Sequence, residues 1–223
     1  MPTLIVLTGP TASGKTAAAL QVAEHFHAPI LNADSRQIYR DIPIGTAAPT
    51  AEEQARVPHY FVGTLALDDY YSAARYEAEV MELLPRLFAE RDVVVMSGGS
   101  MMYIDAVCNG IDDIPTISEE TRTMMRTRYE QEGLEPLLAE LRLADPEYYA
   151  QCDRRNYRRI IHALEVIYQS GKPFSSFRRG EVRERPFRII KIGLQRPRPE
   201  LFARINARVG QMMEKGWLDE VRR

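Results

Sequence analysis

Long apolar runs are missing from this sequence of 223 residues. A membrane-spanning helix needs about 20 consecutive apolar residues, and because no such stretch occurs we expect no membrane segment. The chain enters an apolar stretch at Leu4 without a basic region or a cleavage site before it, so we expect no signal peptide. The only two cysteines, Cys108 and Cys152, match no metal or redox spacing. We therefore expect a cytoplasmic protein with reduced cysteines.

Clusters of metal-binding side chains are also missing. The four histidines, His25, His27, His59 and His162, do not gather at ligand spacing, so structural roles are expected for them. The acidic pairs at 68–69 and 112–113 lack the second acid four residues later that a terpenoid-type metal site would need. The sequence therefore predicts no metal site made of protein side chains alone.

A phosphate-binding loop is present near the N-terminus. The stretch LIVLTGPTASGKT combines an apolar strand with the motif G-x-x-x-x-G-K-[ST], and a helical stretch follows it. The N–H groups of such a loop and the N-terminus of the helix attract phosphate. The motif predicts a diphosphate or a longer phosphate chain and does not identify ATP. The predicted diphosphate-binding residues are Gly9, Pro10, Thr11, Ala12, Ser13, Gly14, Lys15 and Thr16, and the Thr16 hydroxyl is a candidate Mg²⁺ ligand.

Two more apolar stretches, APILNADS and DVVVMSGGS, predict further strands of a doubly wound α/β sheet. Ligands of such sheets bind beyond the carboxyl ends of the strands, so Asp34, Ser35 and the turn at 97–100 are expected near the loop. The predicted fold is therefore an α/β P-loop NTPase-like core with a parallel sheet.

One acid distinguishes this core from that of many nucleotide hydrolases. Such proteins usually carry an Asp at the end of a second apolar strand, where it helps to hold Mg²⁺. Here the strand VVVM ends in Ser97-Gly98-Gly99-Ser100, and the acid, Asp34, ends the other strand. Asp34 is therefore a candidate general base, and a helix N-cap is the alternative interpretation.

A helical region interrupts the core. Between residues 114 and 185 three helical patterns follow one another without a strand, and a strand pattern returns at 187–195. We expect a catalytic core of residues 1–113 and 186–223 with an all-helical insertion at 114–185. The last helical pattern begins at Trp217 and stops after two turns, so we expect the chain to be truncated there.

Charge is divided unevenly along the chain. Residues 151–223 carry 18 Lys and Arg against 8 Asp and Glu, a net charge of +10, whereas residues 1–150 carry 11 against 23, a net charge of −12. Such asymmetry is typical of proteins that bind nucleic acid or another polyanion. Solvated helix faces are the alternative explanation.

Five stretches in this order resemble the tRNA dimethylallyltransferase family, also called tRNA isopentenyltransferase: GPTASGKT, NADSRQIYRDIPIGTAAP, VPHYFVG followed by YSAARY, SGGSMMYIDAVCNGI and HALEVIYQSGKP. The family transfers a dimethylallyl group from dimethylallyl diphosphate to N6 of the adenosine beside the anticodon, position 37, in tRNAs that read codons beginning with U. The resemblance thus implies that the loop holds a prenyl diphosphate with Mg²⁺ as cofactor. It also implies a partner, the tRNA anticodon stem-loop, and we expect a monomer.

The resemblance also implies roles for single residues. Asp34 is the expected base, and Lys15 and Arg208 are the expected cations that act on the diphosphate. The chain has Ser100 where the family usually has Thr, and Asn156-Tyr157 where it usually has an Asp-Pro type pair. The insertion at 114–185 is expected to bind tRNA. The expected tRNA contacts of the whole chain are Asp34, Ser35, Arg36, Gln37, Ser100, Arg122, Arg158, Arg159, Ile160, Ile161 and His162.

Three other functions remain open from the residues. A small-molecule P-loop kinase could use the same loop and base, and ATP turnover would identify it. An adenylate isopentenyltransferase shares the core but does not need a basic insertion. A non-catalytic RNA-binding module would not require Lys15, Thr16 and Asp34 to be intact.

Overall fold

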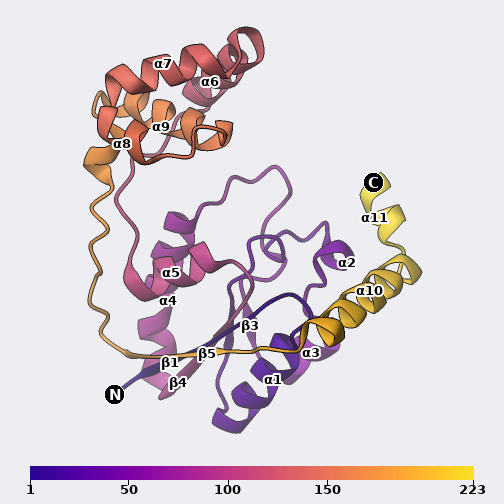
Figure 1. Cartoon of the computed structure of the whole chain (residues 1–223). Helices are drawn as coiled ribbons and strands as arrows, with labels where there is room; N and C mark the ends of the chain where they lie inside the picture. The colour runs from indigo at the N-terminus through magenta and orange to yellow at the C-terminus, as the bar shows by residue number, and fades with distance from the viewer. The chain divides into compact units, whose positions relative to one another are not determined.

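The computed structural model describes every residue, Met1–Arg223, and the chain divides into two compact units. Unit 1 comprises Met1–Ile111 and Val182–Arg223, and unit 2 comprises Asp112–Glu181 (Figure 1). The insertion expected at 114–185 therefore corresponds to unit 2, which begins two residues before the expected start and ends four residues before the expected end. The reason at the second boundary is that Arg183 and Arg185 bond to unit 1. The Arg183 N–H donates to Asn109 O at 2.7 Å, and Arg185 Nη2 lies 2.6 Å from Glu77 Oε1.

Unit 1 contains a five-stranded sheet in which every strand pair is parallel, so the predicted parallel α/β core is confirmed. The strand order is β3-β2-β4-β1-β5. The two-residue strand β3 is too short to leave a recognisable sequence pattern, and it was not predicted. The strands are β1 (Thr3–Thr8), β2 (Ile30–Asn32), β3 (His59–Tyr60), β4 (Val93–Ser97) and β5 (Arg188–Gly193).

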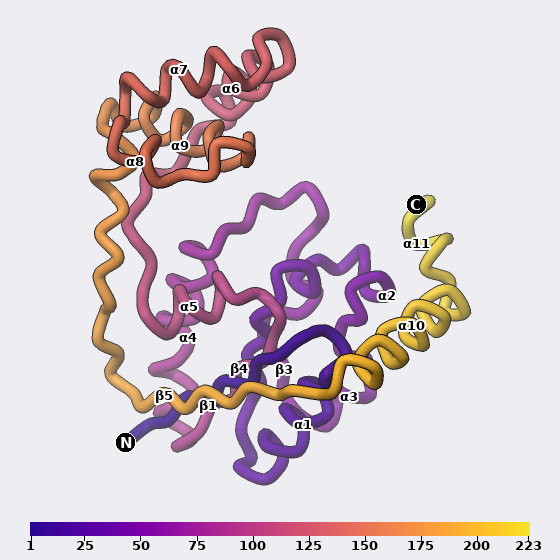
Figure 2. The backbone as a smooth tube through the Cα atoms, in the orientation of Figure 1, coloured from indigo at the N-terminus to yellow at the C-terminus, as the bar shows by residue number.

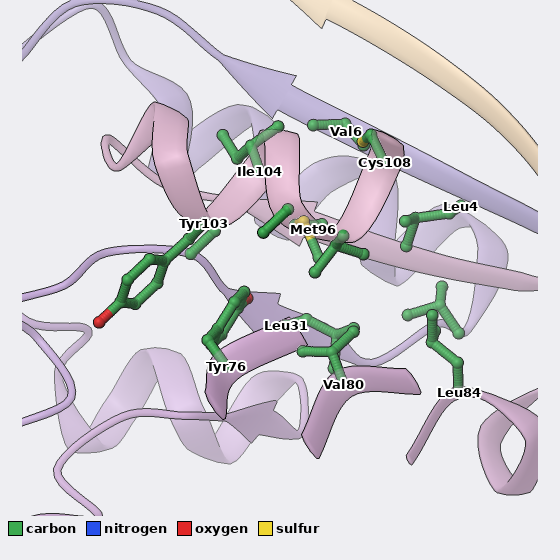
Figure 3. Packing of buried hydrophobic residues seen from close by; sticks show 14 of the residues in the cluster. Leu4, Val6, Leu31, Tyr76, Val80, Leu84, Met96, Tyr103, Ile104 and Cys108 are labelled. Atoms are coloured by element: carbon green, nitrogen blue, oxygen red, sulfur yellow. The ribbon is translucent and has the colours of Figure 1, made fainter. Parts of the chain in front are cut away.

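The central strands are apolar along their length because helices cover both faces of the sheet. Successive side chains of a strand point to opposite faces, so Val94 and Met96 pack in one core cluster and Val95 packs in another. Figure 3 shows the first cluster, in which Val6, Leu31 and Met96 of the strands meet Tyr76 and Tyr103 of the helices. The second cluster packs α1 against the opposite face.

The helices of unit 1 follow the strands. In α4 the residues Tyr76, Val80, Leu84 and Leu87 are buried at helical spacing, and the Ser72 hydroxyl caps its start by accepting from the Arg75 N–H at 3.2 Å. None of the helices is both long and apolar enough to cross a lipid bilayer. The helices are α1 (Lys15–Phe26), α2 (Pro43–Thr46), α3 (Ala51–Arg56), α4 (Ala73–Glu90), α5 (Met101–Asn109), α10 (Arg198–Glu214) and α11 (Trp217–Arg222).

Unit 2 consists of helices around its own hydrophobic core, in which Met125, Leu137, Leu141, Ile160 and Leu164 are fully buried. Ser118 caps its first helix, as its sequence position predicts. Gly171 ends the last α-helix in the left-handed conformation that glycine adopts easily. The elements are α6 (Glu119–Glu132), α7 (Leu134–Ala144), α8 (Pro146–Gln151), α9 (Tyr157–Ser170) and the 3₁₀ helix η1 (Phe174–Phe177).

The second of the three helical patterns, LEPLLAELRLADPEYY, was expected to form one helix and forms two, α7 and α8. The stretch 134–149 breaks at Asp145, because Pro146 has no N–H for the helical ladder and fits the first turn of a new helix. Asp145 is 1% exposed, and its carboxylate accepts from the Tyr148 N–H at 3.0 Å and from the Ser175 N–H at 2.7 Å. A buried carboxylate thus joins the start of α8 to η1.

Candidate active site

A cavity of about 520 Å³ lies in unit 1 and is lined by five loop residues, Thr11, Ala12, Gly14, Lys15 and Thr16, and by residues at the carboxyl ends of β2 and β4. The loop, Asp34 and the turn after β4 are therefore neighbours, as the sheet topology predicts. His59, for which only a structural role was expected, also lines the cavity, and its Nδ1 lies 2.7 Å from Val57 O. The lining includes Thr11, Ala12, Gly14, Lys15, Thr16, Asn32, Asp34, Gln37, His59, Ser97, Gly98, Gly99, Arg204, Arg208 and Gln211.

The loop takes a backbone path that requires its glycines. Gly14 has φ +103°, a conformation that side-chain-bearing residues rarely adopt. A Cβ on Gly9 would lie 2.6 Å from Leu194 O, which is too close for any other residue. Ser13 is 1% exposed and its Oγ has no hydrogen-bond partner. Buried polar atoms are normally paired, so this hydroxyl is an exception, and Ser13 is not among the residues that line the cavity.

Lys15 begins α1 and folds back over the loop. Its Nζ donates to Gly9 O and Pro10 O, each at 2.8 Å. Burial lowers the pKa of the Lys15 ammonium first, the positive charge of Arg208 lowers it further, and the carboxylate of Asp34 raises it. Lys15, Arg208 and Asp34 therefore act on one another electrostatically in the same cavity.

Asp34 uses its two carboxylate oxygens differently. Oδ1 accepts from the Arg36 N–H at 2.9 Å and from the Gln37 N–H at 3.4 Å, so it caps the turn after β2. A Cβ on Gly99 would lie 3.4 Å from Oδ2, which places this second oxygen beside the glycines of the turn after β4. Asp34 therefore caps the turn through Oδ1 alone, and Oδ2 has no hydrogen bond in the protein. A capping role and a role as a base are compatible.

The backbone segments that follow β2 and β4 are in direct contact. A Cβ on Gly98 would lie 2.1 Å from Ala33 O, so only glycine fits there. The Ser35 N–H donates to Ser100 Oγ at 2.7 Å, and the Ser100 N–H donates to Ala33 O at 3.0 Å. Ser100, predicted to contact tRNA, thus positions the turn that carries Asp34. Its hydroxyl accepts this bond, which a Thr hydroxyl could also do.

Three arginines that follow β5 in the sequence bond to backbone carbonyls at the cavity, two of them to carbonyls of the loop. Arg196 Nε donates to Ser13 O at 2.7 Å, and Arg204 Nε donates to Ala12 O at 2.8 Å. Arg208 Nη2 donates to Thr46 O at 3.3 Å. Of these three arginines, Arg208 is the one expected from the resemblance to act on the diphosphate. The four-residue spacing of Arg204 and Arg208 on α10 could have identified Arg204, whereas nothing in the sequence links Arg196 to the loop.

A magnesium ion would have few protein ligands here. No group of three His, Cys, Asp or Glu side chains could hold a metal ion. Mg²⁺ in phosphate sites usually keeps several waters and binds one or two protein oxygens together with the phosphates. Thr16 on the cavity wall fits this mode of binding, and a closed metal site is not needed for it.

The predicted contacts in unit 2 differ in their accessibility. Arg158, Arg159 and His162 are exposed on α9. Ile160 is fully buried in the core of unit 2 and Ile161 packs against that core, so in this segment only the side chains of Arg158, Arg159 and His162 are exposed. Helical periodicity causes this difference, because neighbouring residues of a helix point in different directions. Arg122, on α6, donates from Nε to Ile117 O at 3.4 Å.

An aromatic pair lies beside these arginines. The rings of Tyr129 and Tyr157 stack with centroids 4.9 Å apart and planes 6° apart. Arg158 Nε lies 3.2 Å from the Tyr157 hydroxyl, and its guanidinium lies 5.7 Å from the ring centroid. Aromatic residues among exposed arginines are a common feature of RNA-binding surfaces.

Comparisons with known proteins agree on one family. The family described as IPP transferase matches residues 37–223. The chain is 63% identical over 222 residues to tRNA dimethylallyltransferase 1 of Bacteroides thetaiotaomicron, covering 100% of this chain and 72% of that protein. It is 59% identical over 223 residues to tRNA dimethylallyltransferase 2 of Parabacteroides distasonis, covering 100% of this chain and 75% of that protein.

Solved structures give the same result. The full-length tRNA isopentenylpyrophosphate transferase from Bacillus halodurans is 32% identical with a TM-score of 0.64, and the match covers 100% of this chain and 69% of that one. A eukaryotic dimethylallyltransferase acting on tRNA is 25% identical with a TM-score of 0.81, and the match covers 100% of this chain and 55% of that one.

Proposed function

We propose, since this chain belongs to the tRNA dimethylallyltransferase family, that it transfers a dimethylallyl group from dimethylallyl diphosphate to N6 of the adenosine at position 37 of tRNAs reading codons that begin with U. The chain is a tRNA prenyltransferase. The observation that supports the site of this chemistry is one cavity lined by the phosphate loop, by the cations Lys15, Arg204 and Arg208, and by the carboxylate of Asp34. The acceptor is tRNA, so we expect the enzyme to act in the cytoplasm. All the residues proposed for the site lie in one chain, so a monomer would suffice.

The cations of the cavity act on the leaving group. As N6 attacks the allylic carbon, the carbon–oxygen bond breaks and negative charge builds on the diphosphate. The loop N–H groups, Lys15 and Arg208 are placed to stabilise that charge where it develops. Lys15 bonds to loop carbonyls in the structure, and a bound diphosphate would compete for these hydrogen bonds. Burial lowers the pKa of Lys15 most and the charge of Arg208 lowers it further, and an anionic ligand would relieve the repulsion between these two cations.

Asp34 is the proposed base. The N6 amine must lose a proton after it forms the new bond to carbon. Oδ2 of Asp34 has no hydrogen bond in the protein, and Oδ1 keeps the side chain fixed through the turn. A carboxylate held in this way can accept the proton without reorienting.

Thr16 and the diphosphate oxygens are the proposed ligands of Mg²⁺. The ion would neutralise part of the charge on the diphosphate when it is bound. Thr16 lies in the first turn of α1, where the N-terminus of the helix adds positive potential for the same anion.

Unit 2 is the proposed binding site for the anticodon stem-loop. Arg158, Arg159 and His162 give α9 an exposed basic segment beside the Tyr129–Tyr157 pair. Arginines contribute affinity through phosphate contacts, and an aromatic ring can stack with an unpaired base. The target adenosine has to leave its stack to reach a donor held in a cavity, so a flipped nucleotide is expected.

A direct assay tests the function. The whole protein is incubated with radiolabelled dimethylallyl diphosphate and unmodified tRNA, and label on the RNA is counted. We expect label on tRNA and none on free AMP, which would separate this enzyme from an adenylate isopentenyltransferase. Label on AMP alone would contradict the proposal.

The donor should be preferred over ATP. The strand that precedes the turn at 97–100 ends without the acid that nucleotide hydrolases usually carry, so the cavity should use dimethylallyl diphosphate more productively than ATP. Isothermal titration with each ligand, with tRNA present, measures binding, and chromatography of the nucleotide measures turnover. Tight ATP binding with release of ADP would favour the kinase alternative.

Changing Arg158 and Arg159 together to Ala should weaken tRNA binding regardless of sequence. Loss of about two phosphate contacts should flatten the salt dependence of the affinity correspondingly. Fluorescence anisotropy of a labelled anticodon stem-loop at several salt concentrations measures both effects. Arg142→Ala, an exposed arginine of unit 2 that lies on α7, is the control and should bind normally. Unchanged binding by the double variant at two salt concentrations would show that this helix does not contact RNA.

A further inference from the structure

The carboxylate of Glu220 on α11 binds the start of the short helix α2. Oε2 accepts from the Ile44 N–H at 2.7 Å, and Oε1 accepts from the Gly45 N–H at 2.8 Å. The first N–H groups of a helix have no partner within the helix, and a carboxylate that accepts two of them is a strong, charge-assisted partner. Residues 176 positions apart are thereby joined through two hydrogen bonds.

Trp217 brings α11 into direct contact with the same turn. A Cβ on Gly45 would lie 2.3 Å from Trp217 Nε1, so the indole occupies the space that any other side chain would need. Gly45 is not required for its backbone conformation but for this close approach. Figure 2 shows α11, in yellow, near α2 on the tube. Glu220 and Trp217 therefore hold α2 from one side.

The other side of the same turn faces the cavity. Thr46 O accepts from Arg208 Nη2 at 3.3 Å and from Gln37 Nε2 at 3.0 Å. Ala47 O accepts from Gln37 Nε2 at 3.0 Å. Ala47 has φ +47°, a left-handed conformation that is rare for alanine and that the surrounding contacts must maintain. Both carbonyls thus depend on the placement of residues 43–47.

We propose that Glu220 is a positioning residue for the reaction, which acts through the turn at 43–47 on the guanidinium of Arg208. The proposal rests on the proposed function, because it assumes that Arg208 meets the diphosphate. Glu220 is not among the residues that line the cavity. Its effect reaches Arg208 through the Ile44 and Gly45 N–H groups, the backbone of this turn and the Thr46 carbonyl.

The expected effect depends on how well the Arg208 guanidinium is held in place before the reaction. A guanidinium stabilises developing charge well only if it is held in place before the reaction. Arg208 has a single hydrogen bond to the protein in this structure, the one to Thr46 O. Without the Glu220 carboxylate, the N–H groups of Ile44 and Gly45 lose their acceptors and the turn can shift. Arg208 would then lose its alignment, although its charge would remain.

A double-mutant cycle tests this proposal in the whole protein. We expect Glu220→Ala to slow single-turnover transfer about ten- to hundredfold, since displacement of a catalytic group by about 1 Å costs that much. Glu220→Gln, which keeps one oxygen acceptor, should slow transfer less. In an Arg208→Ala background, Glu220→Ala should slow transfer further by less than about twofold, because residues in one network do not act additively.

Asp219→Ala is the matched control. Asp219 is the preceding acid on α11, its side chain is 73% exposed, and its only ion pair is with Arg222, so transfer should be unchanged. Anticodon stem-loop affinity should be the same in all variants. An equal loss from Glu220→Ala in both backgrounds, or no loss in either, would overturn the proposal, and thermal unfolding identifies variants that lose their fold. Failure of the unmodified protein to label tRNA would instead refute the proposed function.

Discussion

Asp34→Asn should reduce single-turnover transfer by about 10²–10⁴-fold, the range for loss of a positioned general base. The substitution keeps an oxygen that can accept from the Arg36 and Gln37 N–H groups, so the turn after β2 should remain capped. The amide cannot take up the N6 proton. Donor binding and tRNA binding should both stay near normal, because the cap and the cations are unchanged. Rapid-quench transfer of labelled donor, with separate titrations of donor and tRNA, measures these effects.

Asp34→Ala provides a second test of the same side chain. It removes both the base and the cap, so it should lower transfer at least as much as Asp34→Asn and should also lower the thermal stability. Asp41→Asn, at an exposed position on the chain after the same turn, is the control with the same chemical change. Near-normal transfer by Asp34→Asn would show that the carboxylate is only a cap.

Lys15→Ala should weaken donor binding and slow transfer together. Lys15 faces the charge of the diphosphate in the ground state and a larger charge in the transition state, so both quantities should change. We expect transfer to fall by about 10²–10³-fold, the cost of removing one donor to a developing anion. Titration of the donor without tRNA and single-turnover transfer with saturating donor separate the two effects.

Lys215→Ala is the control for this substitution, because Lys215 is an exposed lysine just after α10 and outside the cavity. Lys15→Arg is a further comparison. It keeps the charge but replaces a compact ammonium by a planar fork, and the close fit to Gly9 O and Pro10 O makes full recovery unexpected. Normal donor affinity in Lys15→Ala would indicate that the loop does not hold the diphosphate.

Several features could be predicted from the sequence because they depend on neighbouring residues. The loop needs glycines and Lys15 in one short stretch, and the strands beside it need apolar runs. The position of Asp34 at the end of its strand then places it beside the loop through the general topology of parallel sheets. The division of charge along the chain likewise indicated a polyanionic partner from composition alone.

Burial in unit 2 could be predicted only in part. The run Arg158-Arg159-Ile160-Ile161-His162 looks like one contact segment in the sequence. In the folded unit, α9 turns Ile160 into the core and leaves both arginines outside. Pro146 causes the break at Asp145, whereas the pairing of the buried Asp145 carboxylate depends on Ser175, which is 30 residues away.

The sequence by itself determined the phosphate loop, the parallel α/β core, the succession of helices between Glu119 and Phe177 and the family, because local spacing and short-range conformation carry each of these. Only the tertiary structure decided which arginines reach the loop, which oxygen of Asp34 caps the turn, and how Glu220 joins α11 to α2. The physical reason is distance along the chain. Arg196 and Ser13 are 183 positions apart, and hydrogen bonds over such separations exist only after the sheet and α10 have packed.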